Sequence, residues 1–158
     1  MPSNHRQNDL IADLDPTNRR LLAELQQDAR VSLAELGRRV GLSSPAVAER
    51  LQRLERDGVI RGYRAELDPA LLGFPLTAVI RIRPAPRQLQ MIAEIARAAP
   101  EVVQCDRITG EDCYLLKAFI RSVTHLEELI DQFTPFGQTT TSIVQSSPVP
   151  ARAIDVSI

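Results

Sequence analysis

A chain of 158 residues with 44% hydrophobic residues can form one domain or two small ones, and this composition excludes a largely disordered chain. The formal net charge of −1 hides an asymmetry, because residues 1–64 carry 11 Arg against 9 acids and residues 65–158 carry 8 basic residues against 11 acids. No apolar run has the length of a signal peptide or a membrane helix. The sequence predicts a soluble, cytoplasmic protein, without contact to a membrane, whose N-terminal part can present a basic face.

Start and stop signals in the first part of the chain predict three short helices. The signals are Asp15 before Pro16, Ser32 three residues before Glu35, and Ser43, with Gly41 and Gly58 as terminators. The last two helices are separated by "GLS", which is typical of a helix-turn-helix unit. A short extended segment, "VIRGYRAELDP", follows as a wing. We therefore expect a winged helix-turn-helix domain over residues 10–64 and a linker over residues 65–74.

Arginines on the third helix suggest contact with nucleic acid. Val47, Leu51 and Leu54 form the stripe that faces the other two helices, and we expect the arginines on the opposite side. Small residues and free N–H groups at the helix start favour a phosphate, while guanidinium groups one turn further in can reach base edges. The predicted DNA contacts are Arg38, Arg39, Ser43, Ser44, Ala46, Arg50 and Arg53, with the first two on phosphates.

A purely structural interpretation of the same residues stays open. Ser43 is a good N-cap, and Arg50 can pair with Glu49 or Glu55 on a solvated surface. The high Arg content, with Lys117 as the only lysine, is also what a GC-rich genome produces.

The second part of the chain changes period and predicts β-α-β-β-α-β order. "PLTAVIRIR" alternates between apolar and other residues, "RQLQMIAEIARAAP" is helical, "EVVQCDRIT" and "YLLKAFIR" are strands, "THLEELIDQF" is a helix capped by Thr124, and "TTTSIVQS" is the last strand. This order is the ferredoxin-like pattern, here over residues 75–158. Leu115 and Phe119 alternate with Lys117 on a face that the helices leave uncovered, so we expect a dimer through that face.

The run "LDPTNRRLLAELQQDARVSLAELGRRVGLSSPAVAERLQRLERDGVIRGYRAELDPALLG" resembles the N-terminal half of the Lrp/AsnC family of transcription regulators. "ITGEDCYLLKAFI" and "TTTSIV" resemble the family's ligand-binding and assembly domain, so the resemblance covers residues 10–147. It implies an α+β protein that binds double-stranded DNA at a pseudo-palindromic operator and forms dimers, often octamers. It also implies a small effector, commonly an amino acid, and no other cofactor.

The resemblance further implies an effector pocket between subunits, bordered by a glycine-containing loop and by residues of the last strand. The corresponding residues here are Thr109, Gly110, Glu111, Asp112, Cys113, Thr140 and Ser142. Many relatives have a carboxylate directly before the aromatic residue that begins the third strand, where this chain has Cys113. Which of the two preceding acids receives the effector's ammonium group is therefore open. A hairpin turn with solvated acids is the alternative.

Other functions remain in view at this stage. Some proteins that resemble this family are decarboxylases of haem precursors, but the basic third helix and a content of two histidines argue against an enzyme. A ligand-tuned assembly protein with a vestigial DNA domain is a third option. Cys105 and Cys113 flank a turn, where reduced thiols are a simpler interpretation than a redox switch. The sequence predicts no metal site.

Overall fold

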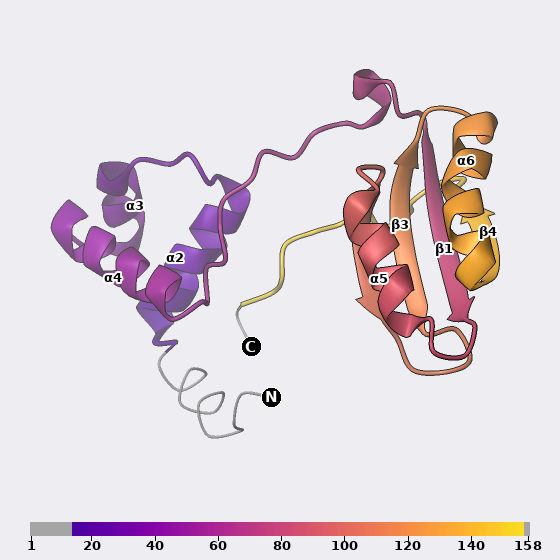
Figure 1. Ribbon diagram of the computed structural model, residues 1–158. Coiled ribbons are helices and arrows are strands. Elements are labelled where there is room, and N and C mark those ends of the chain that lie inside the picture. Colours follow the sequence, from indigo (N-terminus) through magenta and orange to yellow (C-terminus); the bar gives the residue numbers. More distant parts are fainter. Residues whose placement is uncertain (1–13, 157–158) are drawn as a thin grey trace. The chain divides into compact units, whose positions relative to one another are not determined.

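The computed structural model describes residues 14–156 (Figure 1). Two compact units are present. One contains the chain up to Glu66 together with its end from Val149, and the other contains Leu67–Pro148. The predicted domain start at residue 10 lies outside the described residues. The predicted second domain runs to residue 158, whereas contacts group the chain from Val149 onward with the N-terminal helices.

The N-terminal unit contains the three predicted helices, α2 (Pro16–Gln27), α3 (Leu33–Val40) and α4 (Ser44–Arg56). Each predicted cap is confirmed. Asp15, Ser32 and Ser43 accept hydrogen bonds from backbone N–H groups three residues further on, those of Asn18, Glu35 and Ala46. Their apolar faces meet in one core, made of Leu21, Leu22, Leu36, Val40, Val47, Leu51 and Leu54.

The connection between α3 and α4 depends on two glycines. Gly41 has a φ of 75°, in the left-handed region, where a side chain would be strained. Gly37 lies under this turn, and its carbonyl accepts a hydrogen bond from the Leu42 N–H at 2.9 Å. A Cβ atom on Gly37 would lie 2.4 Å from the Leu42 carbonyl oxygen. Only glycine at position 37 permits this close approach, which sets the packing of α4 against α3.

The expected wing corresponds to residues 59–66, which contain neither helix nor strand in this structure. Val59 and Ile60 pack against the helical core, and the Ile60 N–H donates to the Leu54 carbonyl at 3.0 Å. The Tyr63 hydroxyl donates to the Glu55 carboxylate at 2.9 Å. Partial burial of the side chain is the main cause that raises the pKa of Tyr63 to about 12, and this hydrogen bond is the second cause. The segment is thus held against α4 by packing and one side-chain hydrogen bond.

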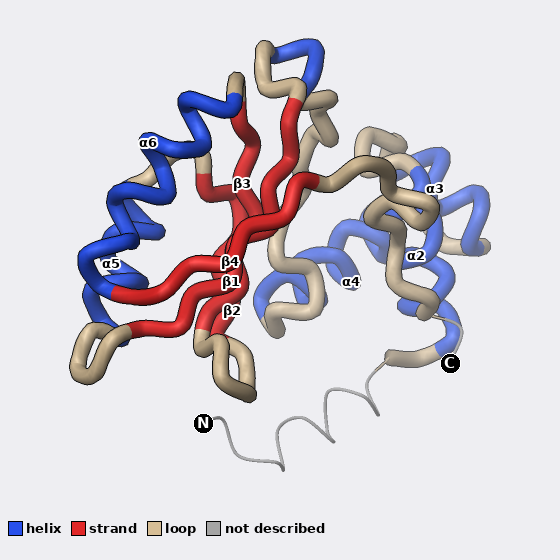
Figure 2. Tube along the Cα trace, turned by 90° about the vertical axis from the view of Figure 1, so that its right-hand side faces the viewer, coloured by secondary structure: helices blue, strands red, loops and turns tan. Residues whose placement is uncertain are grey.

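The second unit has the predicted β-α-β-β-α-β order. Its elements are β1 (Leu76–Pro84), α5 (Leu89–Ala98), β2 (Val102–Arg107), β3 (Tyr114–Ile120), α6 (Val123–Phe133) and β4 (Gly137–Ile143), with one-turn helices at Ala70–Leu72 and Thr134–Phe136. The sheet order is β2-β3-β1-β4, and every pairing is antiparallel. Both helices cover the same side of the sheet (Figure 2). The ferredoxin-like prediction is confirmed.

Alternation along the strands divides the sheet into a covered face and an open face. The covered face forms the second core with α5 and α6, and includes Ala78, Ile80, Ile82, Leu116, Ala118, Ile120, Ile92, Leu129 and Phe133. On β3, Leu115 and Phe119 are half-buried and Lys117 is exposed, as the alternation predicts. The register of β2 against β3 shifts between Val102 and Gln104, which marks an irregularity in this edge strand.

The predicted cap of α6 was wrong by two residues. Ser122, not Thr124, has the extended conformation of an N-cap, and its hydroxyl accepts from the His125 N–H at 3.1 Å. Only Arg121 separates Ser122 from the end of β3 at Ile120, so the helix begins almost as soon as the strand ends.

Candidate functional site

The start of α4 combines small side chains with a capped helix end. Ser43 is exposed, whereas Ser44 and Ala46 are half-buried. The Ser43 hydroxyl accepts from the Ala46 N–H at 3.4 Å, so its own hydrogen remains available for donation. A backbone phosphate or a base edge can therefore approach this helix end closely.

Arg50 does not lie on the outward face where the sequence interpretation put it. Its Nη1 donates to the Asp15 carboxylate at 2.6 Å and to the Asn18 side-chain oxygen at 3.0 Å. Arg50 is three residues after Val47 and four residues before Leu54. Residues at these spacings lie close together on a helix, so Arg50 lies beside the apolar stripe. Its partners are on α2, and not Glu49 or Glu55. Arg50 therefore joins α4 to α2.

Arg53 keeps the exposed position that was predicted for it. Within the part of the chain that the structure describes, no carboxylate lies within ion-pair distance of its guanidinium group. Arg56, one turn from it, is exposed and lies 3.6 Å from the Asp57 carboxylate. Arg53 is therefore an arginine of α4 whose guanidinium group is available to a partner outside the chain.

Arg38 and Arg39, in the last turn of α3, share the carboxylate of Glu35 in its first turn. Arg38 donates to both oxygens of Glu35, at 2.8 and 2.6 Å, and Arg39 donates to Glu35 at 2.8 Å and to Glu24 at 2.7 Å. These hydrogen bonds lower the pKa of Glu35 to about 2. The Arg38 side chain is 74% exposed, so it can exchange this pairing for a phosphate, whereas Arg39 is held from two sides.

The glycine-containing loop of the second unit connects β2 to β3 over residues 108–113. The Ile108 N–H donates to the Cys113 carbonyl at 3.0 Å, and the Cys113 N–H donates to the Ile82 carbonyl at 3.0 Å. Gly110 has a φ of 108°, which only glycine adopts readily. Thr109 and Glu111 are exposed, and the backbone bonds of Cys113 fix the loop to β1.

Two arginines of β1 meet the acids of this loop. Arg83 donates to Glu111, and the Arg81 Nε lies 3.9 Å from the Asp112 carboxylate. The alternation in "PLTAVIRIR" places both arginines on the face opposite Ile80 and Ile82, but the sequence did not predict them as site residues. The sequence signal that could have predicted them is the alternation of β1, which places both arginines on one face, together with the acids of the loop that follows β2.

The predicted residues of the last strand lie on the same open face. Thr140 pairs with Arg81, and Ser142 pairs with Val79, so each shares the face of its partner. Thr140 and Ser142 are both exposed. The structure thus brings together a carboxylate, a guanidinium group and a hydroxyl, from Asp112, Arg81 and Thr140, on the open face of the sheet. Ser142 lies two residue pairs further along β4, on the same face.

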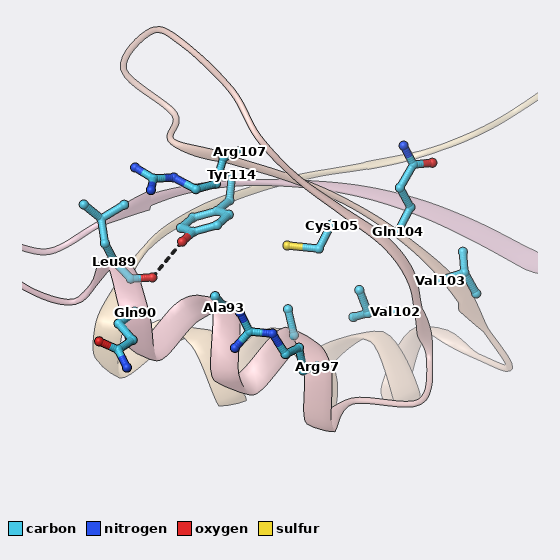
Figure 3. A pocket seen from close by; sticks show the side chains of 11 residues that line it. Leu89, Gln90, Ala93, Arg97, Val102, Val103, Gln104, Cys105, Arg107 and Tyr114 are labelled. Atoms are coloured by element: carbon cyan, nitrogen blue, oxygen red, sulfur yellow. Dashed lines mark hydrogen bonds between the residues drawn. The ribbon is translucent and has the colours of Figure 1, made fainter. Parts of the chain in front are cut away.

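A groove of about 610 Å³ lies elsewhere, between α5 and the edge strand β2 (Figure 3). Cys105 and Arg97 point into it, and the Tyr114 hydroxyl closes one end by donating to the Leu89 carbonyl at 2.8 Å. Burial raises the pKa of the Cys105 thiol. Cys113 packs instead against the core of the second unit, and both cysteines are free.

Among residues 14–156, no three His, Cys, Asp or Glu side chains are grouped so that they could hold a metal ion. No helix in the same range is long and apolar enough to cross a membrane.

A capped helix-turn-helix unit followed by a four-stranded α+β unit defines the class of ligand-responsive transcription regulators. Comparison with known proteins agrees with this class. Residues 14–55 match the AsnC-type helix-turn-helix domain, and residues 77–154 match the Lrp/AsnC ligand binding domain. The chain belongs to the Lrp/AsnC family.

Individual relatives cover most of the chain. It is 33% identical over 133 residues to the transcriptional regulator LrpC of Bacillus subtilis, which covers 84% of this chain and 92% of LrpC. It is 37% identical over 123 residues to the leucine-responsive regulatory protein of Escherichia coli, covering 76% of this chain and 75% of that protein. A transcriptional regulator from Neisseria meningitidis, solved as an L-methionine complex, superposes with a TM-score of 0.80 at 31% identity, covering 88% of this chain and 94% of that one.

Proposed function

We propose that this regulator binds a pseudo-palindromic operator as a dimer and that an amino acid, bound at the loop between β2 and β3, modulates this binding. The observation that carries the effector site is the convergence of Asp112, Arg81 and Thr140 on the open face. A carboxylate can hold an ammonium group, and a guanidinium group can hold a carboxylate. Every free amino acid carries one ammonium group and one carboxylate group at its α-carbon, so this pair of side chains can bind both.

The class of effector is supported by relatives. One similar structure contains L-methionine, and one similar regulator is named for its response to leucine. Both are amino acids with an unbranched or branched apolar side chain. The half-buried apolar residues of the open face, Val79 and Leu115, can accept such a side chain beside the polar groups.

The same open face supports the proposed dimer. Leu115 and Phe119 are partly exposed apolar side chains on a sheet face that neither helix covers. A second copy of this face is a suitable cover, and assembly of dimers into an octamer would bring further surfaces together. Two copies of α4 would then meet half-sites about one helical turn, or a multiple of it, apart.

DNA contact is proposed for Arg53 in the major groove, for the start of α4 at Ser43, Ser44 and Ala46, and for Arg38 on a phosphate. Arg39 and Arg50, which are held by carboxylates in the free protein, support the unit that presents them. We also propose that the chain acts in the cytoplasm, where its DNA is, and is no enzyme. Tetrapyrrole titration should then leave its absorbance unchanged.

Selection from a random duplex library tests the proposal. Purified protein should enrich a pseudo-palindromic sequence, and its affinity for that sequence, followed by fluorescence anisotropy, should change about 5- to 150-fold on addition of L-methionine or L-leucine. Failure to enrich any sequence would contradict the DNA-binding part. An affinity that no amino acid changes would contradict the effector part alone.

A further inference from the structure

The end of the chain is bound to the first helix of the DNA-binding unit. The Gln26 side chain donates from Nε2 to the Ile154 carbonyl at 2.9 Å, and the Ile154 N–H donates to Gln26 Oε1 at 2.8 Å. One amide side chain thereby satisfies both backbone groups of one residue, as a neighbouring strand would. Val156 packs against the hydrophobic core of the same unit.

The surface that receives this segment is the outward side of α2. A groove of about 730 Å³ is lined on one side by Pro16, Arg19, Arg20, Ala23, Gln26 and Gln27 and on the other by residues 152–156. The α2 residues recur with helical spacing, on the side opposite Leu21, Leu22 and Leu25. The segment therefore covers a surface that the three-helix core leaves free.

The sequence before the docked residues favours this arrangement. Pro148 and Pro150 interrupt the stretch that leads from β4 to the segment. Proline restricts the backbone of an unfolded linker, so less conformational entropy is lost when the segment docks. Within the segment, Val156 is half-buried and the Ile154 side chain is 76% exposed, so docking depends on the backbone of Ile154 and the side chain of Val156.

We propose that residues 152–156 are a strap whose docking site is the outward face of α2, and that the strap gives the DNA-binding unit a second connection to strand β4. The docking itself does not depend on the proposed function. The regulatory consequence of docking does depend on the proposed function, because Thr140 and Ser142, in the proposed effector site, belong to the strand that continues into the strap. A ligand that shifts the end of β4 would act on α2 as well as on subunit packing.

Hydrogen exchange at a single amide tests the docking. In the full-length protein, we expect the Ile154 amide, followed by nuclear magnetic resonance, to exchange more slowly than the same amide in an unstructured peptide. Gln26→Ala should accelerate this exchange roughly five- to tenfold, because the Ile154 N–H loses its acceptor and the Ile154 carbonyl loses its donor. Gln52→Ala, at an exposed glutamine of α4 that does not line this groove, is the matched control and should leave the exchange of the Ile154 amide unchanged. An Ile154 amide that exchanges at the unstructured rate in the full-length protein would overturn the strap.

The regulatory consequence has a separate readout. A variant that ends at Pro148 and the Gln26→Ala variant should keep operator binding in the absence of ligand, while the change in affinity caused by L-methionine falls towards onefold. A response equal to that of the full-length protein in both variants would overturn the coupling. If the full-length protein itself responds to no amino acid, the proposed function fails, and the exchange of the Ile154 amide still decides whether the strap exists.

Discussion

Arg50 on α4 reaches back to Asp15, the residue that caps α2, with 2.6 Å between Nη1 and Oδ2. Asp15 thus has two roles, because its other carboxylate oxygen accepts from the Asn18 N–H at 2.6 Å. The hydrogen bond from the Asn18 N–H is the main cause that lowers the pKa of Asp15, and the hydrogen bond from the Arg50 guanidinium group is the second cause. The helix that carries the proposed DNA contacts is therefore tied to the start of α2 by an ion pair as well as by the apolar core.

Removing this pair should destabilise the N-terminal unit by a small and measurable amount. The two side chains are 33% and 43% exposed, so we expect a coupling energy of about 0.2–1 kcal/mol from a double-mutant cycle with Arg50→Ala and Asp15→Ala. Urea denaturation followed by circular dichroism measures it. Additive effects of the two substitutions would show that the pair contributes nothing to stability.

Arg53→Ala should weaken operator binding by about 1–3 kcal/mol if the guanidinium group contacts a base. Arg38→Ala should instead weaken binding to all sequences and reduce the salt dependence by about one unit, as the loss of one phosphate contact does. Fluorescence anisotropy with operator and with random duplex, at several salt concentrations, separates the two. Arg50→Ala serves as the comparison, with a smaller loss that follows its loss of stability.

Position 37 should reject any side chain, and position 41 should accept asparagine. Gly37→Ala directs a Cβ atom to 2.4 Å from the Leu42 carbonyl oxygen, and overpacking of this kind costs about 1–3 kcal/mol. At Gly41 no atom lies within 4 Å of the added Cβ, and asparagine tolerates the left-handed conformation. Thermal denaturation of Gly37→Ala and Gly41→Asn compares them. Equal stability of both variants would contradict the close approach at Gly37.

Stability of the second unit should fall in acid partly through Glu101. The His125 side chain, at 2.9 Å, lowers the pKa of this carboxyl from its ordinary value of 4.5. A lowered pKa means that the ionised form is favoured in the folded state, so the contribution is complete above about pH 4.5 and disappears as the pH falls through the folded-state pKa. Glu101→Gln should therefore lose less stability than the unchanged protein between about pH 5 and pH 3. Parallel pH profiles would contradict this role.

Asp112→Ala should abolish the response to L-methionine while leaving operator binding without ligand nearly unchanged. Asp112 lies beside Arg81 at the convergence of the proposed effector groups, whereas Glu111 pairs with Arg83 and is 83% exposed. Glu111→Ala should keep the response. Thermal shift and fluorescence anisotropy measure the response to L-methionine. If Glu111→Ala abolished the response and Asp112→Ala kept it, Glu111 and not Asp112 would bind the ammonium group.

Local signals predicted most of the fold, because each acts over a few residues. Asp15, Ser32 and Ser43 cap helices where their spacing indicated, and the alternation in β1 and β3 separated the covered face from the open one. The cap at Ser122 was missed because Thr124 is an equally acceptable N-cap in sequence. The choice between them depends on where β3 ends, which pairing with β1 determines.

Long-range partners could not be predicted in the same way. Arg50 is near the edge of the apolar stripe, and it lies 35 residues from Asp15 in the chain, so their pairing requires α4 to pack against the start of α2. The same holds for Arg81 and Asp112, which meet only because β1 lies beside the strand that follows the loop. Gln26 and Ile154 are 128 residues apart, and nothing in either local sequence indicates the other.

The register shift between Val102 and Gln104 has a consequence for assembly. An edge strand with regular pairing offers a row of free N–H and C=O groups to which another chain can add. The irregularity interrupts that row on β2 and increases the local twist, so a second sheet does not continue this one smoothly through that edge. Growth of an extended intermolecular sheet is thereby discouraged from the β2 side.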